Sequence, residues 1–307
     1  MCFIEKSLNM NLDEEIRCGY KVSAQMKHIW NVQMNLLKKL LEACEKHNLR
    51  IWASSGTLLG AVRHGGYIPW DDDIDMVMMR DDYNKLLSIA SAEFKAPYFF
   101  QCAYTETVPY HRGHAQLRMD GTTAILPTDY KLDFHHGIFI DIFVFDAVPE
   151  DDKEVTRLID NIHYWKGKVM QFVSSSRFSF NPIHDLKLLR RLIYCHTHDF
   201  IECYRKYEDA LSTYSIADNT YVVKLGLRYD HEYVVKKKLN KNLYAKTIYM
   251  PFEDTQMPVP EEYDEVLTVL YGDYMNPNRE PTYHGGYLAI DTEKTYEPYL
   301  QELRRTM

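Results

Sequence analysis

The sequence predicts an α/β protein in which a mixed β-sheet with flanking helices is followed by an additional helical lobe. Three features support this fold class. The tight turn Ser54-Ser55-Gly56 separates a short strand from a short helix, a second strand is crowded with aspartates, and Asp141 interrupts an otherwise apolar strand. Strand and helix patterns alternate along the first half of the chain, which is typical of a sheet covered by helices.

The individual elements follow from hydrophobic periodicity. A helix is expected over 20–47, because Val22, Met26, Ile29 and Leu36 recur at steps of three, four or seven. The next expected elements are strand 50–53, helix 57–63, strand 73–79, helix 82–93 capped by Asp81, and strands 98–103, 114–119 and 137–144. Two helical patterns between 151 and 214, split near 174–176 and 181–182, and a helix over 261–271 complete the chain.

Length and composition fit a globular chain of several segments. Of the 307 residues, 46% are hydrophobic and 26% are charged, which is the usual globular balance. We expect an N-terminal segment 1–19, a catalytic core 20–148, a helical lobe 149–248 and a segment 249–307 that returns to the core. The net charge of −8 argues against a nucleic-acid partner, because duplex DNA needs a basic surface. An anionic substrate would need metal ions or local basic residues.

No export signal or membrane-spanning segment is recognised in the sequence. Residues 1–20 lack a basic start followed by an apolar run, and aspartates interrupt the most apolar stretch, 137–148. We therefore expect a cytoplasmic protein, with peripheral contact to the inner face of the membrane left open. The scattered cysteines are expected to be free thiols: Cys2, Cys18, Cys44, Cys102, Cys195 and Cys203.

The acidic segment at strand 73–79 is the strongest chemical signal. Alternate side chains of a strand share one face, so Asp71, Asp73 and Asp75 would lie together if the strand starts that early. Carboxylates this close repel one another and raise each other's pKa unless a cation compensates. Mg²⁺ is the natural cation for oxygen ligands shared with substrate phosphates. The alternative is a solvated acidic turn or a helix N-cap cluster.

Asp141 provides a second signal. It stands inside the run 137–145, which is apolar on both faces and is therefore expected to form a central strand. An unpaired carboxylate in such a place is costly, so Asp141 should face a metal, a cation or a polar cleft. The alternative is a hydrogen-bonded structural aspartate at a strand end.

The turn from Ser54 to Thr57 precedes a helix, where backbone N–H groups can hold a phosphate. Many connections between a strand and a helix look like this. Together with the acidic strand and Asp141, however, the turn resembles the nucleotidyltransferase fold of the polymerase-β type. In that fold three carboxylates hold the metals used in phosphoryl or nucleotidyl transfer.

The stretch from Ser55 to Asp75, SGTLLGAVRHGGYIPWDDDID, looks like the signature of the LicD/fukutin family of phosphotransferases. Three later segments are also similar to that family: 137–143, 251–260, and 271–275 with His284 beyond it. The cysteine-rich zinc-binding insertion of fukutin-like relatives is not recognised in this sequence. The chain therefore resembles the compact bacterial type.

This resemblance implies transfer of a phospho-alcohol from a CDP-activated donor to a glycan hydroxyl. The bacterial type favours phosphocholine from CDP-choline, with a precursor of lipopolysaccharide, teichoic acid or another cell-surface glycan, free or lipid-linked, as acceptor. CDP-glycerol, CDP-ribitol and CDP-ethanolamine are alternative donors for the same chemistry. A non-catalytic binding role in a glycan assembly complex is an alternative of a different class.

The resemblance also implies the site residues. Asp73 and Asp75, with Asp71, would bind one or two Mg²⁺ or Mn²⁺ ions, while Asp141 would complete the site or act as the base that takes the hydroxyl proton. Substrate contacts are expected from Ser55, Gly56, Thr57, Arg63, His64, Trp70 and Arg118. A surface helix end is the alternative for Arg63 and His64, and a structural ion pair is the alternative for Arg118.

Three other clusters give weaker signals. A histidine near the acceptor would come from His111, His114, His135 or His136. A structural zinc site would use Cys195, His196, His198 and Cys203, although no second half of a ligand set is evident. The basic run 236–238 with Lys241 would touch an anionic glycan carrier or a membrane surface, or else form a solvated face.

Overall fold

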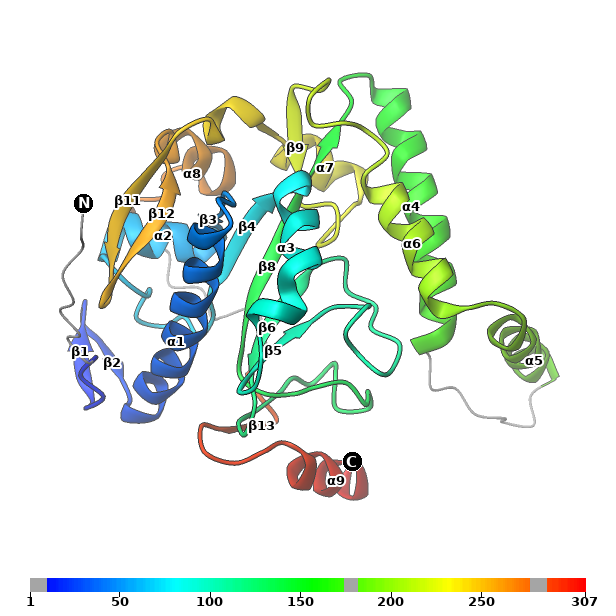
Figure 1. The fold of residues 1–307 in the computed structure, drawn as a ribbon, viewed down its shortest axis with the longest axis horizontal. Coiled ribbons are helices and arrows are strands. Elements are labelled where there is room, and N and C mark those ends of the chain that lie inside the picture. The colour runs from blue at the N-terminus through cyan, green and yellow to red at the C-terminus, as the bar shows by residue number, and fades with distance from the viewer. Residues whose placement is uncertain (1–9, 174–181, 277–285) are drawn as a thin grey trace.

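The computed structural model describes residues 10–173, 182–276 and 286–307, and its centre is a seven-stranded mixed sheet (Figure 1). The strands of this sheet are β3 (Trp52–Ala53), β4 (Asp75–Met79), β5 (Tyr98–Gln101), β6 (Ala115–Met119), β8 (Phe139–Val148), β9 (Tyr221–Val223) and β10 (Leu239–Asn240). β8 pairs in parallel with β4 on one side, and in antiparallel with β6 and then β9 on the other. The predicted α/β class with a mixed sheet is confirmed.

The central strand β8 is buried along its whole length. Its Ile, Phe and Val side chains suit a strand that is covered on both faces. β8 begins at Phe139 and continues to Val148, farther than the expected 137–144, because β9 pairs with its last three residues. Its register with β4 sets Asp75 opposite Asp141, and this pairing positions the candidate site.

Three helices pack on the strands around β4 and β8: α1 (Ala24–Lys46), α2 (Ser55–His64) and α3 (Arg80–Glu93). The helix expected from residue 20 starts at Ala24, because Tyr20–Val22 form strand β2, which pairs with β1 (Glu15–Arg17). Ser23 caps α1 by accepting the Met26 N–H at 3.2 Å. α3 begins directly after β4, so Asp81 lies in its first turn instead of capping it.

A helical lobe lies beside the sheet and consists of α4 (Asp152–Val173), α5 (Pro182–Thr197), α6 (Phe200–Leu211) and α7 (His231–Lys237). α4 and α6 share a second apolar cluster that includes Leu158, Ile162 and Tyr207. The described part of 151–214 holds three helices where two patterns were predicted, because the Asp199 side chain starts α6 by accepting the Glu202 N–H at 2.8 Å. The predicted split at 174–176 and at residue 181 lies outside the described residues.

The remaining described elements are β7 (Thr123–Ile125), the 3₁₀ helix η1 (Lys241–Tyr244), β11 (Thr247–Phe252), β12 (Thr255–Pro260), α8 (Tyr263–Tyr271), β13 (Ala289–Asp291) and α9 (Glu297–Thr306). β11 and β12 form a hairpin, and its Phe252, Met257 and Val259 side chains belong to the main apolar core. β13 pairs with β7.

Two sequence expectations can be compared with the described residues. The cysteines among them are free thiols, which confirms that expectation for Cys18, Cys44, Cys102, Cys195 and Cys203, while Cys2 lies outside the described residues. Among the helices described, none is both long and apolar enough to cross a bilayer.

A buried ion pair between α3 and β8 predicts a large effect on stability. Arg80 donates to Asp146 through Nε at 2.7 Å and Nη2 at 2.9 Å, and both side chains are buried. Asp146→Ala leaves a buried guanidinium without its countercharge, so urea denaturation should show a loss of about 3–5 kcal/mol in the free energy of unfolding. Arg50→Gln, which removes the 3.4 Å surface pair with Asp82, should cost less than about 1 kcal/mol. Equal losses in the two variants would contradict this account.

Candidate functional site

Five aspartates converge where β4 and β8 lie side by side, and we call them the acid cluster: Asp71, Asp72, Asp73, Asp75 and Asp141. Asp75, the first residue of β4, is the direct partner of Asp141 in the parallel pair. Just before β4, the side chains of Asp71, Asp72 and Asp73 each offer a carboxylate oxygen, and these oxygens lie within 4.8 Å of one another. The structure thus brings together the four carboxylates predicted as metal ligands, with Asp72, which was also expected near the cations, beside them.

The prediction from alternating side chains required a strand that starts at Asp71. The structure shows that this part of the prediction is wrong. β4 begins only at Asp75, and residues 71–74 have no regular secondary structure. The chain instead turns after Ile68, whose carbonyl accepts the Asp71 N–H at 2.9 Å. A loop that follows this turn, and not the pleat of a strand, therefore brings the carboxylates close together.

Two helices fix the backbone of the acidic segment. From α1, Trp30 Nε1 donates to the Asp71 carbonyl at 3.0 Å and Gln33 Nε2 donates to the Asp72 carbonyl at 2.8 Å. From α2, the Thr57 hydroxyl accepts the Asp75 N–H at 2.8 Å. Thr57 was expected to touch substrate, but its buried hydroxyl holds the first residue of β4, so we assign it a positioning role.

Gly56 meets a steric requirement of the acid cluster. A Cβ atom at this position would lie 2.6 Å from Asp71 Oδ2, which is far inside van der Waals contact. Any side chain at residue 56 would therefore push the Asp71 carboxylate away. The glycine allows the start of α2 and the acidic segment to approach closely.

The pKa values of Asp73 and Asp141, at the two ends of the acid cluster, are shifted in opposite directions. Partial burial raises the pKa of Asp73 well above its usual range, and the nearby Asp75 and Asp71 carboxylates raise it further. Burial alone would also raise the pKa of Asp141, but the His114 and Gln116 side chains more than offset it, so this pKa is lowered. Their Nε2 atoms lie 3.0 Å and 2.8 Å from Asp141 Oδ1. His114 is thus the predicted histidine that reaches the site.

Lys224, at the end of β9, is a site residue that the sequence reasoning missed. Its buried Nζ donates to Ser54 Oγ at 3.0 Å and to Ser55 Oγ at 2.7 Å. Burial lowers the pKa of Lys224, while the charges of Asp75 and Asp141 raise it in part. A single lysine following the short apolar run 221–223 is the same kind of signal as Asp141, so the sequence offered a clue.

Two tyrosines also face the acid cluster. Burial raises the pKa of Tyr287 well above its usual value, and the charges of Asp72 and Asp73 raise it further. Tyr271, at the end of α8, is 47% exposed, and its pKa is raised first by the partial burial of its ring and then by Asp75. Both phenols therefore stay protonated and can donate hydrogen bonds at this end of the sheet.

Three predicted substrate-binding residues lie at the end of α2 and in the turn after it. Arg63 Nη1 donates to the Tyr274 carbonyl at 2.7 Å, which ties α2 to the segment after α8. The His64 ring packs edge-on against Trp70 with centroids 6.2 Å apart, and Trp70 in turn packs against Tyr20 at 5.9 Å. Their contact with a substrate stays a prediction.

Arg118 was expected to contact phosphate, and the structure corrects this to a structural role. The side chain is 1% exposed, and its guanidinium donates to Gln101, to the Gly137 carbonyl at 2.6 Å and to Gln116 Oε1 at 2.6 Å. The guanidinium is therefore committed to the protein interior. It orients the Gln116 amide, whose Nε2 in turn holds Asp141.

The weaker clusters have structural roles in the described residues. Cys195 Sγ donates to the Gln171 carbonyl at 3.5 Å. Among the described residues, Asp71–Asp73 is the only group of His, Cys, Asp or Glu side chains whose ligand atoms lie close enough together to hold a metal ion. The predicted zinc site at Cys195 therefore has no support. The basic run is engaged locally: Lys236 pairs with Glu232, while Lys237 and Lys241 donate to carbonyls.

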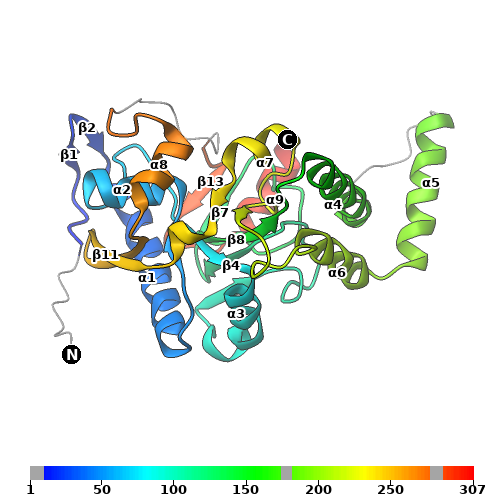
Figure 2. The same ribbon diagram turned by 90° about the horizontal axis from the view of Figure 1, so that it is seen from above.

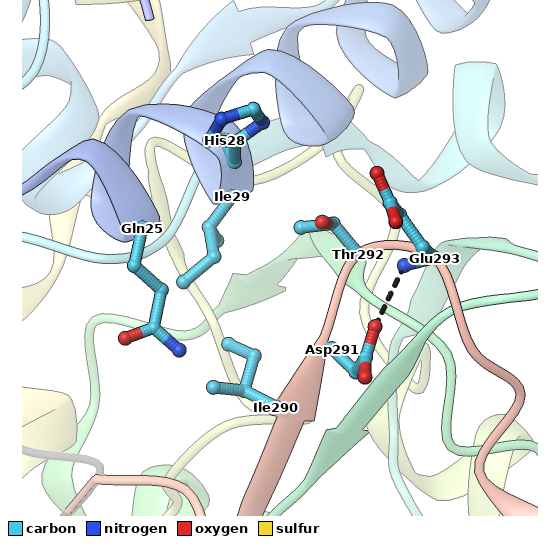
Figure 3. A pocket seen from close by; sticks show the side chains of 7 residues that line it. All are labelled: Gln25, His28, Ile29, Ile290, Asp291, Thr292 and Glu293. Carbon is cyan, nitrogen blue, oxygen red and sulfur yellow. Dashed lines mark hydrogen bonds between the residues drawn. The ribbon is translucent and has the colours of Figure 1, made fainter. Parts of the chain in front are cut away.

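A pocket of about 260 Å³ lies between α1 and the segment that starts with β13 (Figure 3). It is lined by Gln25, His28, Ile29, Ile290, Asp291, Thr292 and Glu293. The Asp291 carboxylate is engaged in its own turn, since it accepts the Glu293 N–H at 2.8 Å and the Tyr299 hydroxyl at 2.7 Å. No member of the acid cluster lines this pocket.

Comparison with known proteins agrees with this geometry. Residues 48–195, which contain all five residues of the acid cluster, match the family described as LicD/FKTN/FKRP, nucleotidyltransferase domain. The lipopolysaccharide cholinephosphotransferase LicD of Haemophilus influenzae is 30% identical over 249 residues, covering 80% of this chain and 89% of that protein. The chain belongs to the LicD family of phosphotransferases.

More local similarity connects this LicD-family chain with other proteins. The human ribitol 5-phosphate transferase FKRP is 41% identical over 49 residues, or 16% of this chain and 10% of FKRP. The uncharacterized protein RP689 of Rickettsia prowazekii is 36% identical over 115 residues, or 38% of this chain and 39% of that protein. As a member of the family, the chain is a phosphotransferase, which leaves the non-catalytic alternative without support.

Buried histidines near the site predict how stability depends on pH. Burial lowers the pKa of His136 to about 4 and that of His135 to about 4, so the folded state binds fewer protons than the unfolded state between about pH 4 and 6.5. The free energy of unfolding should therefore fall as the pH drops through this window. His136 is 1% exposed, and its share should be on the order of 3 kcal/mol.

Urea denaturation of the wild type and of His136→Gln checks this prediction. It is measured at pH 4.5, inside the window of roughly pH 4–6.5 in which this histidine titrates, and at pH 7, above that window. The variant should lose less stability than the wild type as the pH falls. His231→Gln, which removes an exposed histidine paired with Asp152 at the surface, is the control and should change the free energy of unfolding by less than about 1 kcal/mol at either pH. A pH dependence unchanged in His136→Gln would show that this histidine does not titrate as described.

Proposed function

We propose that this LicD-family phosphotransferase transfers phosphocholine from CDP-choline to a hydroxyl of a cell-surface glycan or teichoic acid precursor, with Mg²⁺ as cofactor. The observation that carries the proposal is the acid cluster, in which Asp75 pairs in register with Asp141 and Asp71–Asp73 lie beside them. The name of the Haemophilus influenzae relative supports choline phosphate as the transferred group. We propose that the mixed sheet is a nucleotidyltransferase-type core acting at the cytoplasmic face of a membrane.

The residues of the acid cluster fit a divalent cation. Oxygen ligands are what Mg²⁺ prefers. The pKa of Asp73 is raised first by burial and then by the negative charge of the neighbouring carboxylates, which a cation would offset. Asp71, Asp73, Asp75 and Asp141 would hold one or two ions, and Mn²⁺ would suit the same ligands. A bound ion would neutralise charge on the phosphate oxygens during transfer.

Residues opposite the carboxylates would hold the donor's phosphates. Lys224 Nζ lies between Ser54 and Ser55 at the start of α2, where backbone N–H groups are also available to an anion. We therefore propose that Ser55 and Gly56 contact the phosphates of the CDP-alcohol. Lys224, which the sequence reasoning missed, would supply the positive charge beside them. Arg63, His64 and Trp70 are proposed for the nucleotide or the alcohol, because a tryptophan face can bind a quaternary ammonium.

The proposed reaction is a direct displacement at phosphorus. The acceptor oxygen bonds to the phosphorus that carries choline, the bond to the bridging oxygen breaks, and CMP leaves with that oxygen. Asp141 or solvent takes the hydroxyl proton. We favour a ligand role for Asp141, because its lowered pKa makes it a weak base near neutral pH.

A second donor is supported by a specific observation. The 41% identity with FKRP over 49 residues favours CDP-ribitol as the alternative to CDP-choline. CDP-glycerol and CDP-ethanolamine remain chemically equivalent candidates. The four donors differ only in the alcohol, so a direct comparison of binding separates them.

Thermal unfolding with each donor tests the choice. CDP-choline with Mg²⁺ should raise the melting temperature by several degrees, since ligand at 100 times its Kd adds about 2.7 kcal/mol of stability. The other three CDP-alcohols should give smaller shifts, and each shift should shrink when Mg²⁺ is replaced by a chelator. A larger shift with CDP-ribitol would move the proposal to that donor, and no shift with any of the four would refute it.

Removing one carboxylate of the acid cluster should separate activity from stability. Asp73→Asn should lower the transfer rate by more than about 100-fold, because metal sites tolerate loss of a ligand poorly. Its melting temperature should match or exceed that of the wild type, since repulsion with Asp75 and Asp71 is relieved. Asp81→Asn, an exposed change of the same kind in α3, is the control and should keep full activity. An active Asp73→Asn would exclude the proposed ligand set.

A further inference from the structure

Helix α5 exposes a row of large apolar side chains. The exposed fractions are 50% for Leu186, 47% for Leu189, 43% for Leu192 and 54% for Ile193. These residues follow one another at helical steps of three and four, so they line one side of the helix. A helix on a protein surface normally turns such a row inward. This face of α5 therefore requires a partner.

The opposite side of α5 is already used for packing on α4. Leu188 is buried, Cys195 Sγ donates to the Gln171 carbonyl at 3.5 Å, and the Tyr194 ring packs edge-on against Phe172 with centroids 6.0 Å apart. These contacts fix the rotation of α5 about its own axis. The apolar row is exposed because a different side of the helix is packed against α4.

Helix α5 as a whole is also basic. Over 182–197 the helix carries Lys187, Arg190 and Arg191 against Asp185, a net charge of +2 in a chain of net charge −8. Lys187 and Arg190 are exposed, and neither has an ion-pair partner among the residues that the structure describes. Other surface lysines do pair, as Lys206 does with Glu202 at 2.8 Å. Arg190 follows Leu186 by one turn and therefore lies at the edge of the apolar row, whereas Lys187 lies on another side of the helix.

We propose that α5 docks the protein onto an anionic membrane surface. The apolar row would enter the interface between head groups and acyl chains, Arg190 at its edge would contact lipid phosphates, and Lys187 would add attraction at longer range. α5 lies at one end of the longest dimension of the molecule, beyond α4 and α6 and away from the sheet (Figures 1 and 2). It can therefore meet a flat surface while the acid cluster stays clear of the lipid.

The charge of α5 favours a membrane over a second copy of the chain. In a symmetric dimer through this face, Arg190 of each copy would lie near that of the other and repel it, and Lys187 would add to the repulsion at longer range. An anionic surface attracts the same two cations. The inference does not depend on which CDP-alcohol is the donor, and it holds for any phosphotransferase whose acceptor is linked to a membrane.

Co-sedimentation of the full chain with lipid vesicles tests the proposal. The wild type should bind vesicles of equimolar phosphatidylglycerol and phosphatidylcholine, bind pure phosphatidylcholine weakly, and dissociate as salt rises. Lys187→Gln with Arg190→Gln should weaken binding about fivefold per cation. Leu189→Ser with Ile193→Ser should also weaken it, and light scattering should show the same oligomeric state as the wild type.

A matched control removes two cations elsewhere on the surface. Lys236→Gln with Lys246→Gln lowers the net charge equally at exposed sites outside α5 and should bind as the wild type does. All variants should keep the wild-type melting temperature, because every altered side chain is largely exposed. The proposal is overturned if the wild type ignores anionic vesicles, if the α5 variants bind unchanged, or if Leu189→Ser with Ile193→Ser converts a dimer to monomers.

Discussion

The parallel register of β4 with β8 is the constraint on which the site depends. It places Asp75 opposite Asp141 inside a sheet whose central strand is buried throughout. Burying two like charges away from water costs folding free energy, so the rest of the fold must hold the two carboxylates in place against their repulsion. α1 supplies this restraint through Trp30 and Gln33, which belong to the packed interior and hold the backbone of the acidic segment. The site is therefore built on rigid elements of the core and not on a surface loop alone.

The surrounding polar groups compensate the acid cluster only in part, and unevenly. His114 and Gln116 stabilise the ionised form of Asp141, and the buried Arg118 orients Gln116 from behind. On the other side, Lys224 is shared between the cluster and the serines at the start of α2. The pKa of Asp73 is raised by burial, and the negative charges of its neighbours raise it further. This uneven compensation is what the proposed cation beside Asp73 would complete, and the lysine and α2 would offer positive potential to the proposed anionic donor.

Sequence reasoning found those site residues whose type is unusual for the segment in which they stand. Asp75 on a strand and Asp141 within an apolar run were predicted from residue type and period alone, and both lie where the strands pair. Side-chain direction was not predictable, as Arg118 shows: a basic residue near the site can point into the protein as well as toward a phosphate. Lys224 was missed because its position depends on β9 pairing with the end of β8, a contact between distant parts of the chain. The prediction that β4 starts near Asp71 was wrong, because the chain turns after Ile68 and this turn sets the course of the acidic segment.

The central claim is that the paired carboxylates of β4 and β8 form a divalent-cation site. Isothermal titration of the full chain with Mg²⁺ tests it without any donor or acceptor. The account predicts saturable binding by the wild type and binding at least about tenfold weaker in Asp141→Asn, which keeps the shape of the side chain but removes its charge. Equal Mg²⁺ affinity in the two proteins, or no binding by the wild type, would contradict it.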